Sequence, residues 1–268
     1  DRYGTISISP IFCYIALCFP AKMKLVNINL IIDFDSTLVK LEGLEELAEI
    51  SLKNNPRRDD LINQICAITN LGMTGKISFQ ESLEERLMLF SPNKKHLNEL
   101  VSLLRGNITE SILRNSTFFK ENAENIYIIS GGFREWILPI IKDMGLVEEN
   151  LLANEFIYSN DGSIVGFDRK NPLAQSGGKA DVVGTLDLKG VTVMIGDGYT
   201  DYEVKKQGFA DKFIIFEENI SRTEIATLSD GRAVDWESVL ECIKGYYGEY
   251  VFINSPLKTH CASVLKTT

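Results

Sequence analysis

The sequence has few cysteines, and their spacing is irregular. Five of its 268 residues are cysteine, an odd number without a Cys-x-x-Cys pair. A disulfide framework or a structural zinc site needs paired cysteines, and the sequence predicts neither. A reducing compartment is the default for such a chain, so we expect a cytoplasmic protein.

An excess of positive charge is also missing. The formal net charge is −9. Nucleic acids and anionic membranes bind basic faces, so the charge argues against both as partners. It does not argue against a small phosphate ester, because one metal ion and one lysine can reverse the local field. The sequence leaves a homodimer open.

No apolar run is predicted to span a membrane. The apolar stretch Ile11 to Pro20 is too short. It could be the core of a signal peptide, but we favour a leader at 1–22 outside the folded unit, with the native chain starting at Met23. We also expect 251–268 to be a loosely attached tail, because it lacks clear periodicity.

What the sequence does contain is an alternation of apolar strands and amphipathic helices. Leu25 to Asp33 reads as a buried strand, and further strands are expected at 125–129, 191–195 and 211–216. Strands at 151–158 and 163–167 flank a hairpin turn at 160–162. Helices are expected at 134–144, 179–185 and 236–243. This order predicts a Rossmann-like α/β fold with a parallel sheet.

A long helical region interrupts this alternation after the first strand. Between 42 and 115, apolar residues recur at helical spacing and no strand is evident. We therefore expect a catalytic core formed by 23–41 and 116–250, and an inserted helical cap domain at 42–115.

The first strand ends in two carboxylates, Asp33 and Asp35. Open α/β sheets bind ligands at the carboxyl ends of their strands. A magnesium ion shared between carboxylate and phosphate would remove the repulsion between them. One aspartate could then attack phosphorus while the other protonates the leaving oxygen. Alone, such a pair is more often a solvated loop or a helix cap.

Three further motifs also stand where a strand ends or a helix begins. Asp197 and Asp201 lie in a Gly-Asp-Gly-Tyr-Thr-Asp run that could complete a metal site, with Asp201 in a supporting position. Ser130 and the amide of Gly131 could bind phosphate oxygens, and Lys179 could neutralise the transferred phosphoryl group. Taken singly, each has a simpler interpretation as a turn, a cap or a surface lysine.

In this order, the four motifs resemble those of the haloacid dehalogenase superfamily. The resemblance runs from about Met23 to Ile243 and implies an aspartyl-phosphate enzyme with Asp33 as nucleophile and Asp35 as acid and base. It also implies Mg²⁺ held by Asp33, Asp35 (through its backbone carbonyl) and Asp197.

The run from Asp33 to Glu42, the Ser130-Gly131-Gly132-Phe133 run, and the stretch from Gly75 to Arg86 resemble the phosphoserine phosphatase family more narrowly. This implies hydrolysis of O-phospho-L-serine, the last step of serine biosynthesis, with Glu42 on the substrate amine and Arg86 on its carboxylate. An arginine fork suits a carboxylate. From pattern alone, Glu42 is equally a helix-start acid and Arg86 a side chain at the margin of an apolar stripe.

Several alternatives stay open at this point. They are a phosphatase for phosphohomoserine, phosphocholine or phosphoethanolamine, a phosphotransferase to an alcohol, and a catalytically silent binding protein. Residues 159–176 depart from the phosphoserine phosphatase pattern, which leaves the exact substrate open.

Overall fold

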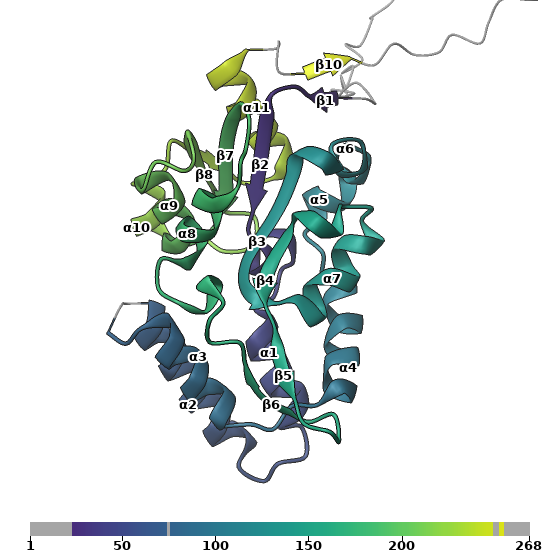
Figure 1. Ribbon diagram of the computed structural model, residues 1–268, viewed down its shortest axis with the longest axis vertical. Helices are drawn as coiled ribbons and strands as arrows, with labels where there is room; N and C mark the ends of the chain where they lie inside the picture. The colour runs from purple at the N-terminus through teal and green to yellow at the C-terminus, as the bar shows by residue number, and fades with distance from the viewer. Residues whose placement is uncertain (1–22, 74–75, 249–251, 255–268) are drawn as a thin grey trace, which may run out of the picture.

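The computed structural model describes residues 23–73, 76–248 and 252–254. A six-stranded parallel sheet with the order β4-β3-β2-β7-β8-β9 forms its centre (Figure 1). The α/β fold with a parallel sheet is thereby confirmed. The leader at 1–22 lies outside the described residues, as does most of the tail. The strands are β2 (Ile28–Ile32), β3 (Ile126–Phe133), β4 (Leu151–Asn154), β7 (Val191–Gly196), β8 (Lys212–Phe216) and β9 (Gly231–Ala233).

Helices cover both faces of this sheet, which explains why its strands are apolar along their whole length. Strand β2 shows the principle. Its side chains alternate, so that Leu30 and Ile32 face one hydrophobic cluster and Ile31 faces the other. One face is covered by α8 (Gly178–Thr185), α9 (Tyr199–Lys206) and α10 (Thr223–Ala226). The other is covered by α5 (Glu110–Arg114), α6 (Ser116–Glu121), α7 (Arg134–Asp143) and α11 (Trp236–Tyr247).

The expected helical stretch after the first strand is present. It contains α1 (Gly43–Ser51), α2 (Arg58–Met73), α3 (Phe79–Met88) and α4 (Lys94–Arg105). Helices α2 and α3 pack on each other away from the sheet, whereas α4 packs on both α1 and α7 (Figure 1). A bridge between Val39 and Ile108 links the two chain segments that enter and leave this stretch. The short helices α5 and α6 lie against α11, where Phe119 and Trp236 have ring centroids 4.6 Å apart.

The prediction of a single strand at 151–158 is wrong, because this segment forms two strands. The chain breaks at Glu155, so that β4 joins the central sheet and β5 (Phe156–Tyr158) forms the hairpin with β6 (Ile164–Phe167). At the break, the backbone N–H of Phe156 donates to the Glu135 carboxylate at 2.8 Å instead of to a strand. The expected turn at 160–162 is confirmed.

Two strand pairings were not expected from the sequence. The short edge strand β9 pairs with β8, and β1 (Met23–Leu25) pairs antiparallel with β10 (Phe252–Asn254). The second pair places part of the expected tail beside the start of the described chain.

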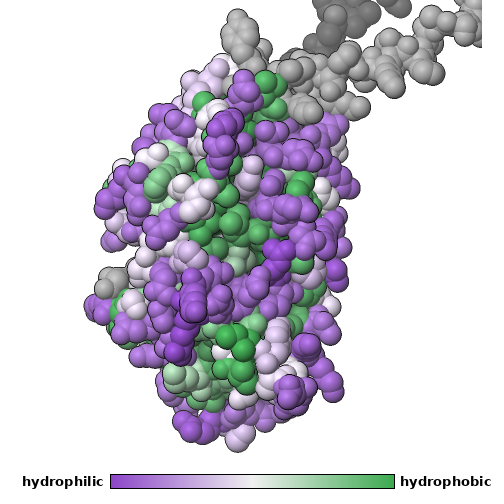
Figure 2. All heavy atoms as spheres, in the orientation of Figure 1, coloured by the Kyte–Doolittle hydropathy of each residue, from purple (hydrophilic) through white to green (hydrophobic). Residues whose placement is uncertain are grey.

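None of the described helices is long and apolar enough to cross a membrane. Hydrophilic side chains cover most of the face in Figure 2, and apolar atoms are visible near its centre and its lower end. The chemistry of the protein therefore has to be sought where polar side chains gather at the sheet.

Candidate active site

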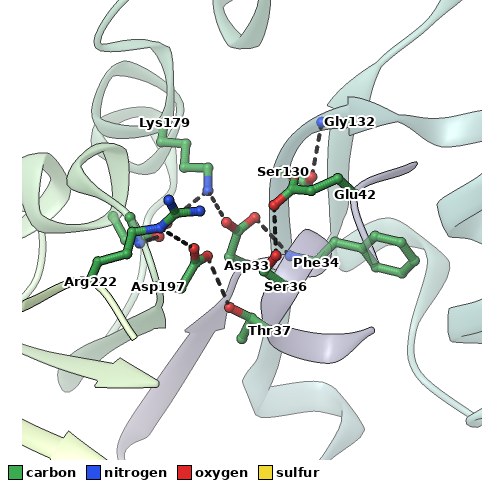
Figure 3. Close-up of polar contacts among 12 residues, drawn as sticks. Asp33, Phe34, Ser36, Thr37, Glu42, Ser130, Gly132, Lys179, Asp197 and Arg222 are labelled. Carbon is green, nitrogen blue, oxygen red and sulfur yellow. Dashed lines mark hydrogen bonds and ion pairs between the residues drawn. The ribbon is translucent and has the colours of Figure 1, made fainter. Parts of the chain in front are cut away.

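The four predicted motifs meet at the carboxyl edge of the central strands. Strand β2 lies between β3 and β7, with Ile32 paired to Ile128 on one side and to Ile195 on the other. The residues towards the carboxyl ends of these strands are therefore neighbours in space. They include Asp33 after β2, Ser130 in the last half of β3 and Asp197 after β7, and Lys179 joins them from the start of α8 (Figure 3).

Asp33 is held firmly at the end of β2. Its backbone N–H donates to the carbonyl of Ile195 at 3.0 Å, which extends the ladder by one residue. Its Oδ1 accepts from the N–H of Phe34 at 2.7 Å, and its Oδ2 lies 2.7 Å from Lys179 Nζ. Both carboxylate oxygens are thus oriented before any ligand binds.

Lys179 joins two carboxylates inside the protein. Its side chain is 8% exposed, and Nζ lies 2.7 Å from both Asp33 Oδ2 and Asp201 Oδ1. Burial alone would lower the pKa of Lys179, but the charges of Asp201 and Asp33 outweigh it and raise that pKa. The lysine is therefore a permanent cation at the site.

A close approach of the backbone positions Lys179. A Cβ on the preceding residue, Gly178, would lie 1.8 Å from the carbonyl oxygen of Pro172. No other residue fits there, so the start of α8 can pack directly on the turn η4 (Pro172–Ala174). The glycine before the lysine is thus required by packing.

The run after β7 adds two buried acids. Asp197 Oδ2 lies 2.8 Å from Arg222 Nε, and Asp201 Oδ2 accepts from the Gly198 N–H at 3.0 Å. The position of Asp201 also requires a glycine at 196, since a Cβ on Gly196 would lie 2.2 Å from Asp201 Oδ2. Both acids are therefore fixed by the fold.

Asp33, Asp197 and Asp201 could together hold a metal ion. One carboxylate oxygen from each lies within 4.8 Å of the others. Burial, and then the charge of Asp33, raise the pKa of Asp197 in spite of the nearby Arg222. This excess of negative charge, offered only by oxygen donors, fits a hard divalent cation.

Ser130 closes the site on the side of β3. The residue is 1% exposed, and its Oγ accepts from the Gly132 N–H at 2.9 Å. This leaves the hydroxyl proton free to donate to a ligand. Gly131 lies under the ring of Phe79 from α3, where a Cβ would come within 2.9 Å of Phe79 Cζ. The end of β3 that carries Ser130 is therefore in contact with helix α3.

The Asp35 side chain is held between the start of α1 and the Ser130–Gly132 segment, where a Cβ at Gly132 would lie 2.9 Å from its Oδ2. Its Oδ1 accepts from the N–H of Gly43 at 2.8 Å. Burial, followed by the charges of Glu42 and Asp33, holds the pKa of Asp35 well above its ordinary value. A carboxyl in this environment keeps its proton and can act as an acid.

Glu42 stands close by, at the N-cap of α1. Its side chain makes no capping hydrogen bond and instead accepts from the Ser36 hydroxyl at 2.6 Å (Figure 3). Burial raises the pKa of Glu42 to about 7, although the Ser36 hydrogen bond opposes the rise. The interpretation as a plain helix-start acid does not account for this inward position.

Arg86 of α3 is buried, with 9% of its surface exposed. Its Nε donates to the Ser82 carbonyl at 3.1 Å, and Nη1 donates to Thr69 Oγ1 at 3.3 Å. Within the described part of the chain no carboxylate forms an ion pair with it, although Glu45, Glu42 and Asp35 are close enough to influence its pKa. The structure thus has a buried guanidinium that faces acids without being paired to one.

Two residues of this site were not predicted from the sequence. Arg222 pairs with Asp197, and Asn219 Nδ2 donates to Thr109 Oγ1 at 2.7 Å and to the Ser36 carbonyl at 3.1 Å. Both belong to the loop after β8, which carries no recognisable motif. Only its position after a central strand could have indicated them.

Comparison with known proteins identifies the family of the chain. Residues 30–204 match the family described as haloacid dehalogenase-like hydrolase. The chain is 33% identical over 214 residues to the chloroplastic phosphoserine phosphatase of Arabidopsis thaliana, covering 79% of this chain and 70% of that protein. It is 31% identical over 196 residues to the phosphoserine phosphatase of Homo sapiens, covering 72% and 83%.

Solved structures share the fold. A phosphoserine phosphohydrolase-like protein from Francisella tularensis superposes with a TM-score of 0.70 at 36% identity, over 80% of this chain and 99% of that one. A phosphoserine phosphatase structure described as a phospho-aspartyl intermediate analogue superposes with a TM-score of 0.61 at 22% identity, over 82% and 98%.

Proposed function

The chain belongs to the haloacid dehalogenase-like hydrolase family, and we propose that it hydrolyses O-phospho-L-serine to L-serine and phosphate. One juxtaposition in the structure carries this proposal. The Asp33–Lys179 pair suits a phosphoryl group, and the inward Glu42 and unpaired Arg86 close to it suit an amine and a carboxylate. Phosphoserine carries these three groups in one small molecule. This reaction would make the enzyme the last step of serine biosynthesis.

In this proposal Asp33 is the nucleophile. The N–H of Phe34 and the cation of Lys179 already orient its carboxylate. Attack of a carboxylate oxygen on phosphorus forms an aspartyl-phosphate and breaks the bond to the serine oxygen. Asp35, which keeps its proton because its pKa is raised, donates that proton to the leaving oxygen. The Asp35 carboxylate then removes a proton from the water that cleaves the intermediate.

Binding of the phosphoryl group falls to Ser130, the amide of Gly131 and Lys179. The Ser130 hydroxyl has a free proton, because its oxygen already accepts from Gly132. The charge of Lys179 is permanent, which suits the developing charge of the transferred group.

We propose Mg²⁺ as the cation, held by the Asp33 carboxylate, the backbone carbonyl of Asp35 and Asp197. Asp201 then positions this set from behind, through its contacts with Lys179 and Gly198. When bound, the ion offsets the repulsion between these carboxylates and a dianionic phosphate. Arg222 now pairs with Asp197, and we expect that contact to loosen when the ion is bound.

Recognition of serine falls to Glu42 and Arg86. Arg86 offers a guanidinium without a carboxylate partner, so it can take a substrate carboxylate in a bidentate pair. We treat 42–115 as the cap domain that brings this arginine over the core. A direct contact supports the arrangement, since the backbone N–H of Phe79 in α3 donates to Ser176 Oγ at 3.2 Å.

The proposal is tested by phosphate release from equal concentrations of O-phospho-L-serine, phosphohomoserine, phosphocholine and phosphoethanolamine, with Mg²⁺ and with a chelator. We expect Mg²⁺-dependent release that strongly favours phosphoserine. If another ester is preferred, the chemistry stands and the roles of Glu42 and Arg86 fall. An added acceptor alcohol that receives the phosphoryl group would indicate a phosphotransferase instead.

A cytoplasmic location and a homodimer complete the proposal. Neither depends on the geometry of the site. Cell fractionation checks the first, and light scattering on the purified protein checks the second.

A further inference from the structure

Asn154 lies at the carboxyl end of β4 and is completely buried. Both of its amide protons are used. Nδ2 donates to the carbonyl of Gly131 at 2.9 Å and to the carbonyl of Leu173 at 3.1 Å. These carbonyls belong to two separate segments, the irregular last part of β3 and the turn η4. No donor among the described residues reaches Asn154 Oδ1, so the Nδ2 group alone connects the two segments.

The first contact fixes a peptide plane next to Ser130. A peptide group is planar, so its carbonyl and its N–H point in opposite directions. The Gly131 carbonyl accepts from Asn154, and the N–H of the same peptide, which belongs to Gly132, donates to Ser130 Oγ at 2.9 Å. Asn154 thereby sets the direction of the N–H that holds the Ser130 hydroxyl.

The second contact fixes the turn on which Lys179 rests. Leu173 is in the middle of η4, and the adjacent Pro172 carbonyl meets Gly178 so closely that a Cβ there would be 1.8 Å away. A shift of this turn would move Gly178 and, with it, Lys179. One amide group therefore bonds to both the segment that positions Ser130 and the turn that positions Lys179.

We propose that Asn154 is a positioning residue for phosphoryl transfer, which keeps Ser130 and Lys179 at a fixed separation. This inference rests on the proposed phosphatase function but adds a residue to it. Among the described residues the Asn154 side chain donates to Gly131 and Leu173 and not to Glu42 or Arg86, so its loss should weaken binding of the phosphoryl group and leave binding of serine unchanged. Catalysis depends steeply on such placement, because an error of about 1 Å costs on the order of 100-fold.

The test compares Asn154→Leu, which keeps the size and removes both donors, with two matched controls. Asn150→Ala removes a comparable side-chain to backbone hydrogen bond at the other end of β4, where Asn150 Nδ2 donates to the Ile126 carbonyl at 3.0 Å. Asn171→Ala loosens only the turn, since Asn171 Oδ1 accepts from the Leu173 N–H at 3.0 Å, and it leaves the Gly131 contact in place. With saturating Mg²⁺, one measures kcat, KM and the melting temperature. One also measures inhibition by orthovanadate, a mimic of the transferred phosphoryl group, and by L-serine.

We expect Asn154→Leu to lower kcat/KM by roughly 10- to 100-fold and to weaken orthovanadate inhibition by a similar factor. Inhibition by L-serine should stay within about twofold of wild type. Asn150→Ala should change the melting temperature more than kcat/KM, and Asn171→Ala, which disturbs one of the two contacts, should lower kcat/KM less than Asn154→Leu does. An equal loss for both inhibitors, or equal losses in Asn154→Leu and the controls, would overturn the inference.

Two further outcomes are also decisive. If Asn154→Leu and Asn154→Ala both fail to fold while the controls fold, Asn154 is structural and the inference falls. If the wild type does not hydrolyse phosphoserine, the proposed function fails. The inference is then judged on turnover of p-nitrophenyl phosphate and on orthovanadate alone, with the same expected losses.

Discussion

Replacing Arg86 by methionine should change substrate preference more than it changes stability. The side chain is buried, and its guanidinium has no ion-pair partner in the described part of the chain. Methionine has a similar length and packs well in such a position. Loss of one partner of a buried charge pair costs about 2 to 4 kcal/mol, which is roughly 30- to 700-fold in kcat/KM.

This loss should apply to phosphoserine but not to phosphoethanolamine, which has no carboxylate. The ratio of the two kcat/KM values should therefore fall by the same factor, and kinetics with both substrates measures it directly. The melting temperature of Arg86→Met should be equal to or higher than that of wild type, because an unpaired buried charge is costly. If both substrates lose activity equally, Arg86 does not read the carboxylate and the reasoning is refuted.

Other variants test the remaining roles. Asp33→Asn should lower kcat by about 10⁴-fold or more while leaving the circular dichroism spectrum unchanged; residual activity near wild type would exclude Asp33 as nucleophile. Asp35→Asn should lower kcat/KM, which reports the steps up to loss of the leaving group, far more for phosphoserine than for p-nitrophenyl phosphate, whose leaving group needs no proton; an equal loss of kcat/KM would argue against Asp35 as the acid. The pKa of Glu42 is about 7 in the folded protein and about 4.5 in the unfolded chain. In chelator, the stability that this raised pKa provides is therefore complete below pH 4.5 and is lost as the pH rises to about 7. Glu42→Gln should then melt higher than wild type at pH 8 and similarly at pH 5, and no difference at pH 8 would contradict the burial of a charge. Mg²⁺ at 100 times its dissociation constant should stabilise wild type by about 2.7 kcal/mol, which is measured as a rise in melting temperature. The rise should be much smaller in Asp197→Asn, and an equal rise would exclude Asp197 as a ligand.

The parallel sheet and the motif positions could be predicted because both follow from local patterns. An apolar run that stops at Asp33 or Asp197 marks the carboxyl end of a buried strand. The division of 151–158 into two strands was not predicted, although Asn154 and Glu155 interrupt its apolar residues, because the partner that captures the Phe156 N–H, Glu135, lies on a different helix. Long-range competition of this kind leaves no local pattern.

The candidate site shows the same limit. Lys179 was predicted from its glycines, yet its two carboxylate partners come from the end of β2 and from helix α9, which are brought together by the sheet order. The burial of Arg86 was undecided from helical spacing, which placed it at the edge of a stripe. Arg222 and Asn154 were missed because their partners are distant in the sequence. Arg222 pairs with Asp197, and Asn154 donates to Gly131 and Leu173, and only the fold brings these residues together.

The central claim is that a phosphoryl group passes through Asp33. The most direct measurement is to mix the enzyme with phosphoserine and Mg²⁺, quench with acid within the first turnovers, reduce with borohydride and sequence the peptides by mass spectrometry. Borohydride converts an aspartyl-phosphate to homoserine, so the account predicts homoserine at position 33 and unmodified aspartate at position 35. Conversion at another carboxylate, or none under conditions of active turnover, would contradict it.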